Sequence, residues 1–357
     1  MVAKTGTFLK PVSAIFLALV LAAVTVVVIR LPSESRPGNS TAESGAENST
    51  AVWTGALNQT KLAAADPSVM YFGDEYYAYY TSAGLNVAVS VDGITYENVG
   101  PTLGTSDLPP NLGDKRWAPS VAWDGVKFVM VFAAQDLYDS NDAMCIWRAT
   151  SNSPTGPFTN VTTWYCEATG YGVIDPSLFD DVSAANSPME YTLARFGSVG
   201  SSVGCGIYSI ETNPDGTSGM PHLLLSGNCG DDTASDNYKE NPEMAKAPDG
   251  TYVLFYSMND YRTDNYETGW ATCVSPRERC VDHGRILTTS TVVDGKTSSG
   301  PGGLSIGNNE RFEYVGFHRR DASVGASRYL TTTVLTWEHG HTPAFGMDMA
   351  APTETST

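Results

Sequence analysis

Three short motifs place a carboxylate beside a proline at separate points along the chain. They read Ala-Asp-Pro-Ser-Val around Asp66, Ile-Asp-Pro-Ser-Leu around Asp175 and Glu-Asn-Pro-Glu-Met from Glu240 onward. Proline restricts its own φ and favours an extended conformation of the residue before it, so an Asp directly before Pro, as at Asp66 and Asp175, is expected on restrained backbone. One Asp-Pro-Ser alone is more often a surface turn, but the set of three predicts a pocket lined by carboxylates. Two such groups flanking a glycosidic bond can hydrolyse it.

The elements that must position these motifs are strands. From Asp66 onward, apolar and aromatic runs alternate with Asp-Gly turns, and no long helical periodicity appears. We therefore expect an all-β chain with strands at Tyr76–Thr81, Val87–Val91, Val126–Ala133, Cys145–Ala149, Tyr191–Arg195, Gly206–Ile210, Tyr252–Ser257, Gly269–Cys273 and Phe312–Phe317.

The motifs recur at near-regular intervals. Asp66, Trp117, Asp175, Glu240 and Gly300 are separated by 51, 58, 65 and 60 residues. Periods of this size in an all-β chain are typical of propeller blades with about four strands each. Five motifs predict a five-bladed β-propeller, in which the innermost strands meet at one axis and bring the motif residues together. A pair of β-sandwich domains is the alternative, but it leaves the period unexplained.

The charge of the chain limits its partners. The net charge is −18 and the sequence pI is about 4.5. Binding to phosphate requires clustered Lys and Arg, so we expect no nucleic acid partner and no binding to an anionic membrane surface. A neutral substrate would experience no such repulsion.

The N-terminus has the features of a targeting segment. Lys4 and Lys10 precede the apolar run Val12–Ile29, which Arg30 closes. We expect an uncleaved membrane anchor or a cleaved signal peptide within residues 1–30. A polar linker at 31–58 and a propeller domain at 59–357 follow. In either case the domain is exported, to the cell surface or the extracellular space.

Six cysteines in an exported chain indicate disulfides, and 15 pairings are possible. Pairing of sequence neighbours is the simplest prediction because each closed loop then stays within one local β unit: Cys145–Cys166, Cys205–Cys229 and Cys273–Cys280. The absence of a Cys-x2-Cys spacing, together with five scattered histidines, argues against a zinc site.

In the order of its motifs the chain resembles glycoside hydrolase family 43. The resemblance covers about Ala64 to Phe345 and rests on Asp66–Val69, Tyr76–Thr81, Arg116–Val121, Ile174–Phe179, Glu240–Pro242, Tyr252–Ser257 and Gly300–Gly303. It implies a five-bladed propeller that hydrolyses arabinofuranosides, xylosides or related pentose polymers with inversion. The partner would be a polysaccharide or oligosaccharide, and we expect a monomer without a cofactor.

The resemblance also implies roles for the carboxylates. Asp66 matches the general base, Asp175 the residue that orients and tunes the acid, and Glu240 the general acid. A base must be ionised, whereas an acid must keep its proton near neutral pH, which a neighbouring carboxylate favours by repulsion. Glu243 is the rival acid, or alternatively a charge at the strand edge.

Two further residues are candidates for substrate binding. Trp117 offers an aromatic face for a sugar, although a core tryptophan is an equal alternative. Arg328 matches an arginine near the pocket of similar chains. It would pair with Asp175 or a sugar hydroxyl, or form a structural salt bridge.

The fifth motif departs from the family pattern. Gly302-Gly303-Leu304-Ser305 lacks the histidine that holds a central ion in many members. A structural calcium is therefore not expected, and His318 is either a substitute ligand or an ordinary strand residue. Leu304 also stands where a polar residue is usual, so the polarity of the pocket differs.

Two other functions are alternatives. A non-catalytic, surface-anchored carbohydrate-binding propeller is compatible with the departure at Leu304 but not with the retention of all three carboxylates. A retaining fructan hydrolase would require Asn-Asp-Pro-Asn, Arg-Asp-Pro and Glu-Cys motifs, which fit this chain poorly.

Overall fold

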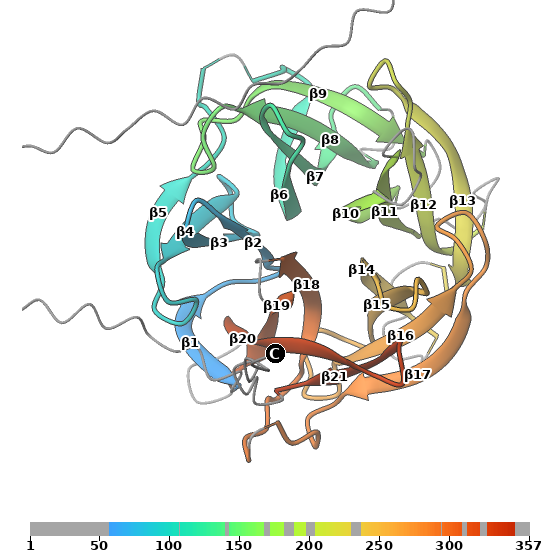
Figure 1. Cartoon of the computed structure of the whole chain (residues 1–357). Coiled ribbons are helices and arrows are strands. Elements are labelled where there is room, and N and C mark those ends of the chain that lie inside the picture. The colour runs from blue at the N-terminus through green and yellow to red at the C-terminus, as the bar shows by residue number, and fades with distance from the viewer. Residues whose placement is uncertain are drawn as a thin grey trace, which may run out of the picture. The chain divides into compact units, whose positions relative to one another are not determined.

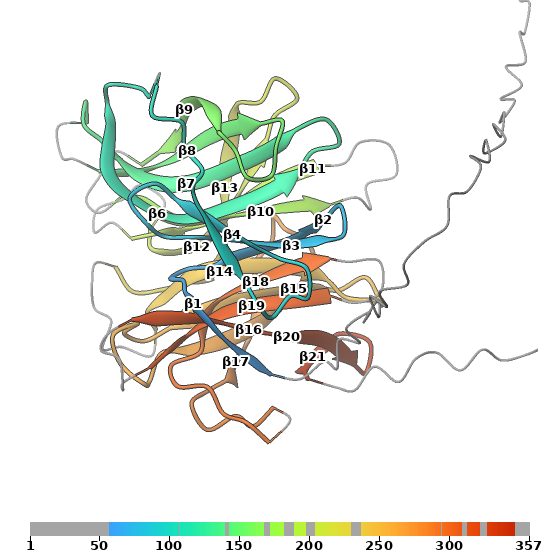
Figure 2. The same ribbon diagram turned by 90° about the vertical axis from the view of Figure 1, so that its left-hand side faces the viewer.

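Five antiparallel sheets surround one axis, seen face-on in Figure 1 and from the side in Figure 2. This computed structural model describes residues 57–346 except for 107, 140–142, 168–171, 182–188, 198–203, 230–236, 294, 309–312 and 322–326. The targeting segment at Val12–Ile29 and the linker up to residue 56 lie outside the described residues. The described part confirms the predicted all-β, five-bladed propeller.

Four of the sheets contain four strands each, which run from the axis outward in chain order. Blade 1 contains β2 (Ser68–Phe72), β3 (Glu75–Tyr80), β4 (Asn86–Ser90) and β5 (Glu97–Pro101). Blade 2 contains β6 (Leu112–Trp123), β7 (Phe128–Asp136), β8 (Met144–Ser151) and β9 (Thr159–Cys166). Blade 3 contains β10 (Val173–Asp181), β11 (Met189–Phe196), β12 (Gly206–Thr212) and β13 (Ser218–Ser226). Blade 4 contains β14 (Lys239–Lys246), β15 (Tyr252–Met258), β16 (Glu267–Cys273) and β17 (Val281–Leu287).

Blade 5 joins the two ends of the described chain. It contains β18 (Gly302–Asn308), β19 (Glu313–Arg320) and β20 (Arg328–Glu338). One part of β20 pairs with β1 (Asn58–Ala63) and another with β21 (Thr342–Phe345). Leu57, directly before β1, is buried. The earliest described strand therefore closes the last blade, so the ring has no open seam between blades 1 and 5.

The inter-blade interfaces explain why the middle strands are apolar on both faces. Every side chain of β15 is buried, because β15 packs against blade 3 on one side and blade 5 on the other. Each of the five junctions has its own apolar cluster, and burial of these clusters is the main force that holds the ring together. The outer strands face solvent, and β5 has no fully buried residue.

The five inner strands share one local irregularity near the axis. Each contains a residue with positive φ, or follows one closely: Asp66 (47°), Ala118 (45°), Asp175 (55°), Asn241 (46°) and Gly303 (60°). The extended conformation expected before proline is therefore not found at Asp66 and Asp175. Proline follows the positive-φ residue in blades 1 to 4, and Leu304 follows it in blade 5. In blades 2 to 5 the ladder shifts register at this point, as at a β-bulge. Such bulges re-aim side chains, and here they direct residues from different blades toward the axis.

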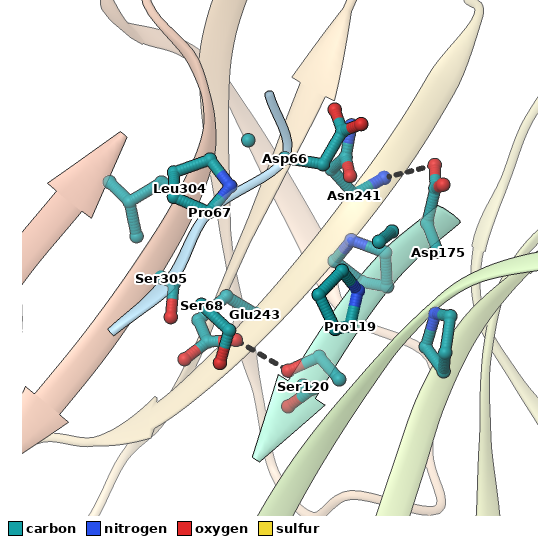
Figure 3. A pocket seen from close by; sticks show the side chains of 15 residues that line it. Asp66, Pro67, Ser68, Pro119, Ser120, Asp175, Asn241, Glu243, Leu304 and Ser305 are labelled. Carbon is teal, nitrogen blue, oxygen red and sulfur yellow. Dashed lines mark hydrogen bonds between the residues drawn. The ribbon is translucent and has the colours of Figure 1, made fainter. Parts of the chain in front are cut away.

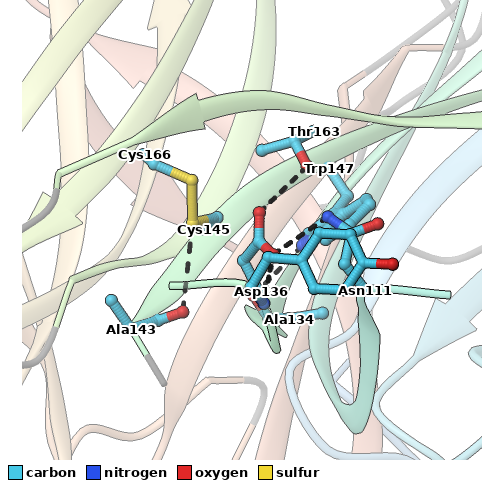
Figure 4. The surroundings of a disulfide bond; sticks show 9 residues. Asn111, Ala134, Asp136, Ala143, Cys145, Trp147, Thr163 and Cys166 are labelled. Atoms are coloured by element: carbon cyan, nitrogen blue, oxygen red, sulfur yellow. Dashed lines mark hydrogen bonds between the residues drawn. A yellow bond between two sulfur atoms is a disulfide. The ribbon is translucent and has the colours of Figure 1, made fainter. Parts of the chain in front are cut away.

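The predicted disulfide pairing is confirmed. Cys145–Cys166, Cys205–Cys229 and Cys273–Cys280 have Cα–Cα distances of 4.5, 5.2 and 4.2 Å. Each joins consecutive strands of one blade. Figure 4 shows the first, between β8 and β9, beside the Asp136 carboxylate that accepts hydrogen bonds from Asn111 and Thr163.

Candidate active site

One cavity of about 420 Å³ collects residues from all five blades. It is lined by Asp66, Thr81, Trp117, Ile174, Asp175, Tyr238, Glu240, Asn241, Tyr261, Arg262 and Arg328. All five residues that the sequence singled out for catalysis or substrate binding are among them. Positions up to 262 residues apart in the chain are thus brought to one place by the ring.

Asp66 is held as a carboxylate. Its Oδ1 accepts a hydrogen bond of 2.6 Å from Arg328 Nη1, and its Oδ2 accepts one of 2.8 Å from Thr81 Oγ1. Burial by itself raises the pKa of Asp66, but the charge of Arg328 and these hydrogen bonds outweigh it, so the pKa is lowered. Arg328 therefore pairs with Asp66 rather than with Asp175, because β20 delivers it to the blade 1 side of the cavity.

His318 lies behind Asp66 on β19. Its Nδ1 accepts a hydrogen bond of 3.3 Å from the backbone N–H of Asp66, and its side chain is completely buried. Burial, with the nearby charge of Arg328, lowers the pKa of His318 to about 3. The imidazole is therefore neutral near neutral pH, and its Nδ1 is occupied by the hydrogen bond from Asp66.

Glu240 and Asp175 form a buried pair with raised pKa values. The pKa of Glu240 is raised by burial, against the opposing effects of the Arg195 charge and a hydrogen bond from Tyr266. The pKa of Asp175 is raised well above its usual range by burial and by the charges of Glu240 and Asp66. Two buried carboxyl groups that repel each other cannot both ionise easily, so the pair retains a proton where Asp66 does not.

Several neighbours of this pair were missed by sequence reasoning. Tyr266 donates a hydrogen bond of 2.8 Å to Glu240 Oε1, and the backbone N–H of Asn241 donates one of 3.1 Å to Asp175 Oδ2. Arg195 is buried on β11, with its guanidinium 4.3 Å from the centre of the Tyr238 ring. Of these neighbours, only Arg195 had a local signal in the sequence. It is a charged residue within an apolar strand, and charged residues are rarely buried without a partner.

Trp117 lies between the cavity and a buried apolar cluster. It lines the cavity, and it also packs against Ala133, Met144 and Ile174. Buried side chains therefore support the indole, while part of it is exposed to the cavity.

Glu243 does not line the cavity of the three carboxylates. It lines a second, narrow cavity of about 30 Å³, together with Asp66, Asp175 and the proline and serine positions of the inner strands (Figure 3). Its Oε1 accepts a hydrogen bond of 2.9 Å from the N–H of Ile306, and its Oε2 accepts one from Ser177 Oγ. Glu243 therefore lies in a different cavity from Glu240, while Asp66 and Asp175 border both cavities.

Glu243 belongs to a belt of hydrogen bonds between neighbouring blades. Equivalent positions are occupied by Ser68, Ser120, Ser177 and Ser305 in the other blades. Three of these hydroxyls accept from a backbone N–H of the next blade, with distances of 3.3 Å for Val121 to Ser68, 3.1 Å for Leu178 to Ser120 and 3.1 Å for Val69 to Ser305. Glu243 spans the two remaining junctions, so the belt closes around the axis.

The position of Glu243 predicts a pH-dependent stability. Burial raises its pKa from 4.5 to about 7, against the lowering effect of its two hydrogen bonds. In the unfolded chain Glu243 ionises near its ordinary pKa, whereas in the folded protein it keeps its proton to a higher pH. Its contribution to the free energy of unfolding is therefore fully present below pH 4.5 and is lost as the pH rises through about 7. A pKa difference of this size corresponds to about 3 kcal/mol.

Glu243→Gln should remove this pH dependence. Between about pH 4 and pH 8, we expect wild type to lose about 3 kcal/mol more unfolding free energy than the variant does, because the amide cannot ionise. Urea titrations at a series of pH values measure the difference. Glu97→Gln on the exposed strand β5 is the matched control and should keep the wild-type slope. Parallel profiles of wild type and Glu243→Gln would contradict the prediction.

The described residues offer no evident metal set. Calcium requires six to eight oxygen ligands. Of the three carboxyl groups that line the axial cavity, those of Glu243 and Asp66 already accept hydrogen bonds through both oxygens, and Asp175 accepts one from Asn241. Residues Asp136, Cys145 and Cys166 lie close enough to hold a metal ion, but their two sulfurs form a disulfide. The described chain also contains no helix of sufficient length and apolarity to span a bilayer.

Solved structures of glycoside hydrolases share this fold. A thermostable family-43 glycoside hydrolase is 24% identical with a TM-score of 0.65, over 82% of this chain and 96% of that chain. Endo-1,4-beta-xylanase from Bacteroides thetaiotaomicron VPI-5482 is 23% identical with a TM-score of 0.62, over 82% and 96%. Alpha-L-arabinofuranosidase from Lactobacillus brevis is 17% identical with a TM-score of 0.59, over 80% and 94%.

Sequence comparison supplies the family. No curated protein matches the chain, and structural likeness at the identities above shows the fold alone. The sequence profile of Glycosyl hydrolases family 43, however, matches residues 60–343, which include all five blades and every residue of the carboxylate cavity. The chain therefore belongs to glycosyl hydrolase family 43, a family of glycosidases.

Proposed function

We propose that this glycosidase hydrolyses pentose glycosides, either arabinofuranosides or xylosides, by a single displacement with inversion. One observation carries the proposal: the same cavity contains a carboxylate with a lowered pKa, Asp66, and a carboxyl pair with raised pKa values, Glu240 and Asp175. Hydrolysis by inversion requires such a division between an ionised base and a protonated acid.

The roles follow from the charges. Asp66 is the general base that removes a proton from the attacking water, because Arg328 and Thr81 keep it ionised. Glu240 is the general acid that gives its proton to the departing glycosidic oxygen. Asp175 is the third carboxyl, whose repulsion with Glu240 favours retention of a proton by the pair. A separation of about 6.5–9.5 Å between the Asp66 and Glu240 carboxyl groups would leave room for the water.

The substrate class rests on the family and on the cavity. Solved structures with this fold are described as an endo-1,4-beta-xylanase, an alpha-L-arabinofuranosidase and arabinanases, all of which act on pentose polymers or pentosides. Trp117 offers a supported aromatic face inside the cavity, which suits the apolar face of a pentose ring. Arg328 forms an ion pair with Asp66, so we assign it to keeping the base ionised rather than to binding a sugar hydroxyl.

We also propose an exported, monomeric enzyme that acts on an extracellular polysaccharide or oligosaccharide. The three disulfides support an oxidising compartment. The apolar run at Val12–Ile29 supports export through a signal peptide or attachment to the membrane through a single anchor.

The experiment that tests the function combines product release with stereochemistry. Purified protein is incubated with 4-nitrophenyl arabinofuranoside and 4-nitrophenyl xyloside, and the first-formed sugar anomer is followed by proton NMR. We expect release from at least one pentoside, with an initial product of inverted configuration. An initial product of retained configuration would refute inversion. Binding of pentose oligosaccharides without any hydrolysis would instead support the non-catalytic propeller.

A further inference from the structure

The Gly300–Gly303 motif makes room for two aromatic rings beside the carboxylates. A methyl group on Gly302 would lie 2.1 Å from Cε1 of Tyr266, and one on Gly303 would lie 2.8 Å from Nδ1 of His318. Gly303 also has a φ of +60°, which other residues adopt only with strain. Neither clash can be relieved by a flexible side-chain end, because both rings are completely buried. The two glycines are therefore required for the present positions of these rings.

The two rings form a stacked pair. Tyr266 and His318 lie with ring centroids 5.4 Å apart and an interplanar angle of 4°. Tyr266 comes from the loop before β16 in blade 4, and His318 from β19 in blade 5. The Ser257 hydroxyl lies beside the glycine motif, since it accepts a hydrogen bond of 2.8 Å from the N–H of Gly303 and would lie 3.1 Å from a methyl group on Gly302.

Each ring presents a polar atom to a different catalytic candidate. Asn241 Nδ2 donates to the Tyr266 hydroxyl at 2.9 Å, so the hydroxyl proton is directed at Glu240 Oε1, 2.8 Å away. On the other side, His318 Nδ1 accepts from the N–H of Asp66, whose φ of 47° would otherwise be costly for a residue other than glycine. Tyr266 thus orients a side chain, and His318 holds a strained backbone.

We propose that the stacked pair of Tyr266 and His318, seated by Gly302 and Gly303, positions the acid Glu240 and the base Asp66 relative to each other. This inference rests on the proposed function. It gives Tyr266 and His318 a role as positioning residues. It also explains the glycines at positions 302 and 303, which have no part in the chemical step. A methyl group on Gly302 would displace Tyr266 and thereby Glu240, whereas one on Gly303 would displace His318 and thereby Asp66. Neither effect requires contact between the glycine position and the substrate.

Tyr266→Phe tests the acid side. Phenylalanine keeps the ring and the stack but removes the hydroxyl, so Glu240 loses one donor. We expect kcat to fall about 10–100-fold on a pentoside with an unactivated alcohol as leaving group, the size of one hydrogen bond to a charged or ionisable group. On the 2,4-dinitrophenyl pentoside, whose leaving group needs no proton, kcat should stay within about twofold of wild type. KM should be unchanged on both substrates.

His318→Phe tests the base side and should give the opposite signature. Loss of the Nδ1 acceptor releases the backbone of Asp66, and the base is needed whatever the leaving group. We therefore expect kcat to fall by similar factors on the activated and the unactivated substrate. His318→Asn, which offers an amide oxygen near the position of Nδ1, should recover part of the loss.

The glycines are tested by a double-mutant cycle. Gly302→Ala should reproduce the leaving-group dependence of Tyr266→Phe, whereas in a Tyr266→Ala background the added methyl should cost little more, because its clash partner is gone. If Gly302→Ala fails to fold, the two ring variants still decide the question. Tyr256→Phe is the matched control: it removes a hydroxyl that donates to Asp282, outside the carboxylate cavity, and should leave kcat unchanged.

The outcomes separate this inference from the proposed function. If Tyr266→Phe equals wild type, or loses equally on both substrates, the positioning role is refuted even when Glu240→Gln shows the dependence expected of an acid. If wild type releases no sugar from any pentoside, the proposed function itself has failed.

Discussion

Replacement of Glu240 by glutamine is expected to lower kcat on a pentoside with an unactivated leaving group by about 10²–10⁴-fold, the usual contribution of general acid catalysis. The amide has nearly the same shape and can still accept the hydrogen bond from Tyr266, but it has no proton to transfer. With a 2,4-dinitrophenyl leaving group, which departs without protonation, most of the wild-type rate should return. Steady-state kinetics on a series of aryl pentosides of decreasing leaving-group pKa measures this dependence.

A matched control lies three residues along the same strand. Glu243→Gln makes the same chemical change on β14, in the axial belt rather than in the carboxylate cavity. It should alter stability without changing the dependence of the rate on the leaving group. An equal loss for Glu240→Gln on all leaving groups would argue against a role as the acid. If the rate of Glu243→Gln depended on the leaving group, Glu243 would again be a candidate for the general acid.

Replacement of Asp66 by asparagine is expected to cost about 10²–10⁴-fold in kcat on every pentoside, whatever the leaving group, since the attacking water always needs a base. The pKa of Asp66 is lowered by Arg328 and by its hydrogen bonds, so the wild-type base is ionised throughout the working range. Azide, a nucleophile that requires no base, should restore turnover of the activated substrate and yield a glycosyl azide of inverted configuration. Product analysis by NMR distinguishes this azide from free sugar.

Asp181→Asn is the matched control for the base. Asp181 is buried in blade 3 and accepts a hydrogen bond of 2.7 Å from Tyr252, but it does not line the carboxylate cavity. Its replacement should leave kcat unchanged. If Asp66→Asn retained full activity, or if azide gave a product of retained configuration, Asp66 would not be the base of an inverting reaction.

The strands that sequence predicted are those whose burial leaves a mark on composition. The runs at β3, β7 and β15 are apolar and aromatic because both of their faces are covered by neighbouring blades. The outer strands β5, β9, β13 and β17 were missed, since few of their side chains are buried and they resemble loop residues. Strand β20 was missed as well, although its central residues are buried, because threonines interrupt its apolar run. The pairing of β1 with β20 was also missed, because no local pattern connects segments about 270 residues apart.

For the site, sequence supplied the carboxylates and structure supplied their environment. Asp66, Asp175 and Glu240 were found because proline and strand signals stand directly beside them. The partner of Arg328 was left among several alternatives, and the tertiary structure places it on Asp66. Tyr266 and His318 stand beside no motif, yet they contact Glu240 and Asp66 across blade boundaries.

By itself, the sequence indicated the middle strands of the blades, the five-fold period, the simplest disulfide pairing and the three carboxylates, because each depends on residues near one another in the chain. Backbone restraint by proline, alternation of apolar residues and closure of short loops are all short-range effects. Only the tertiary structure decided which carboxylate is ionised and which pair retains a proton. A pKa depends on burial and on charges within a few ångströms, and here those charges come from other blades.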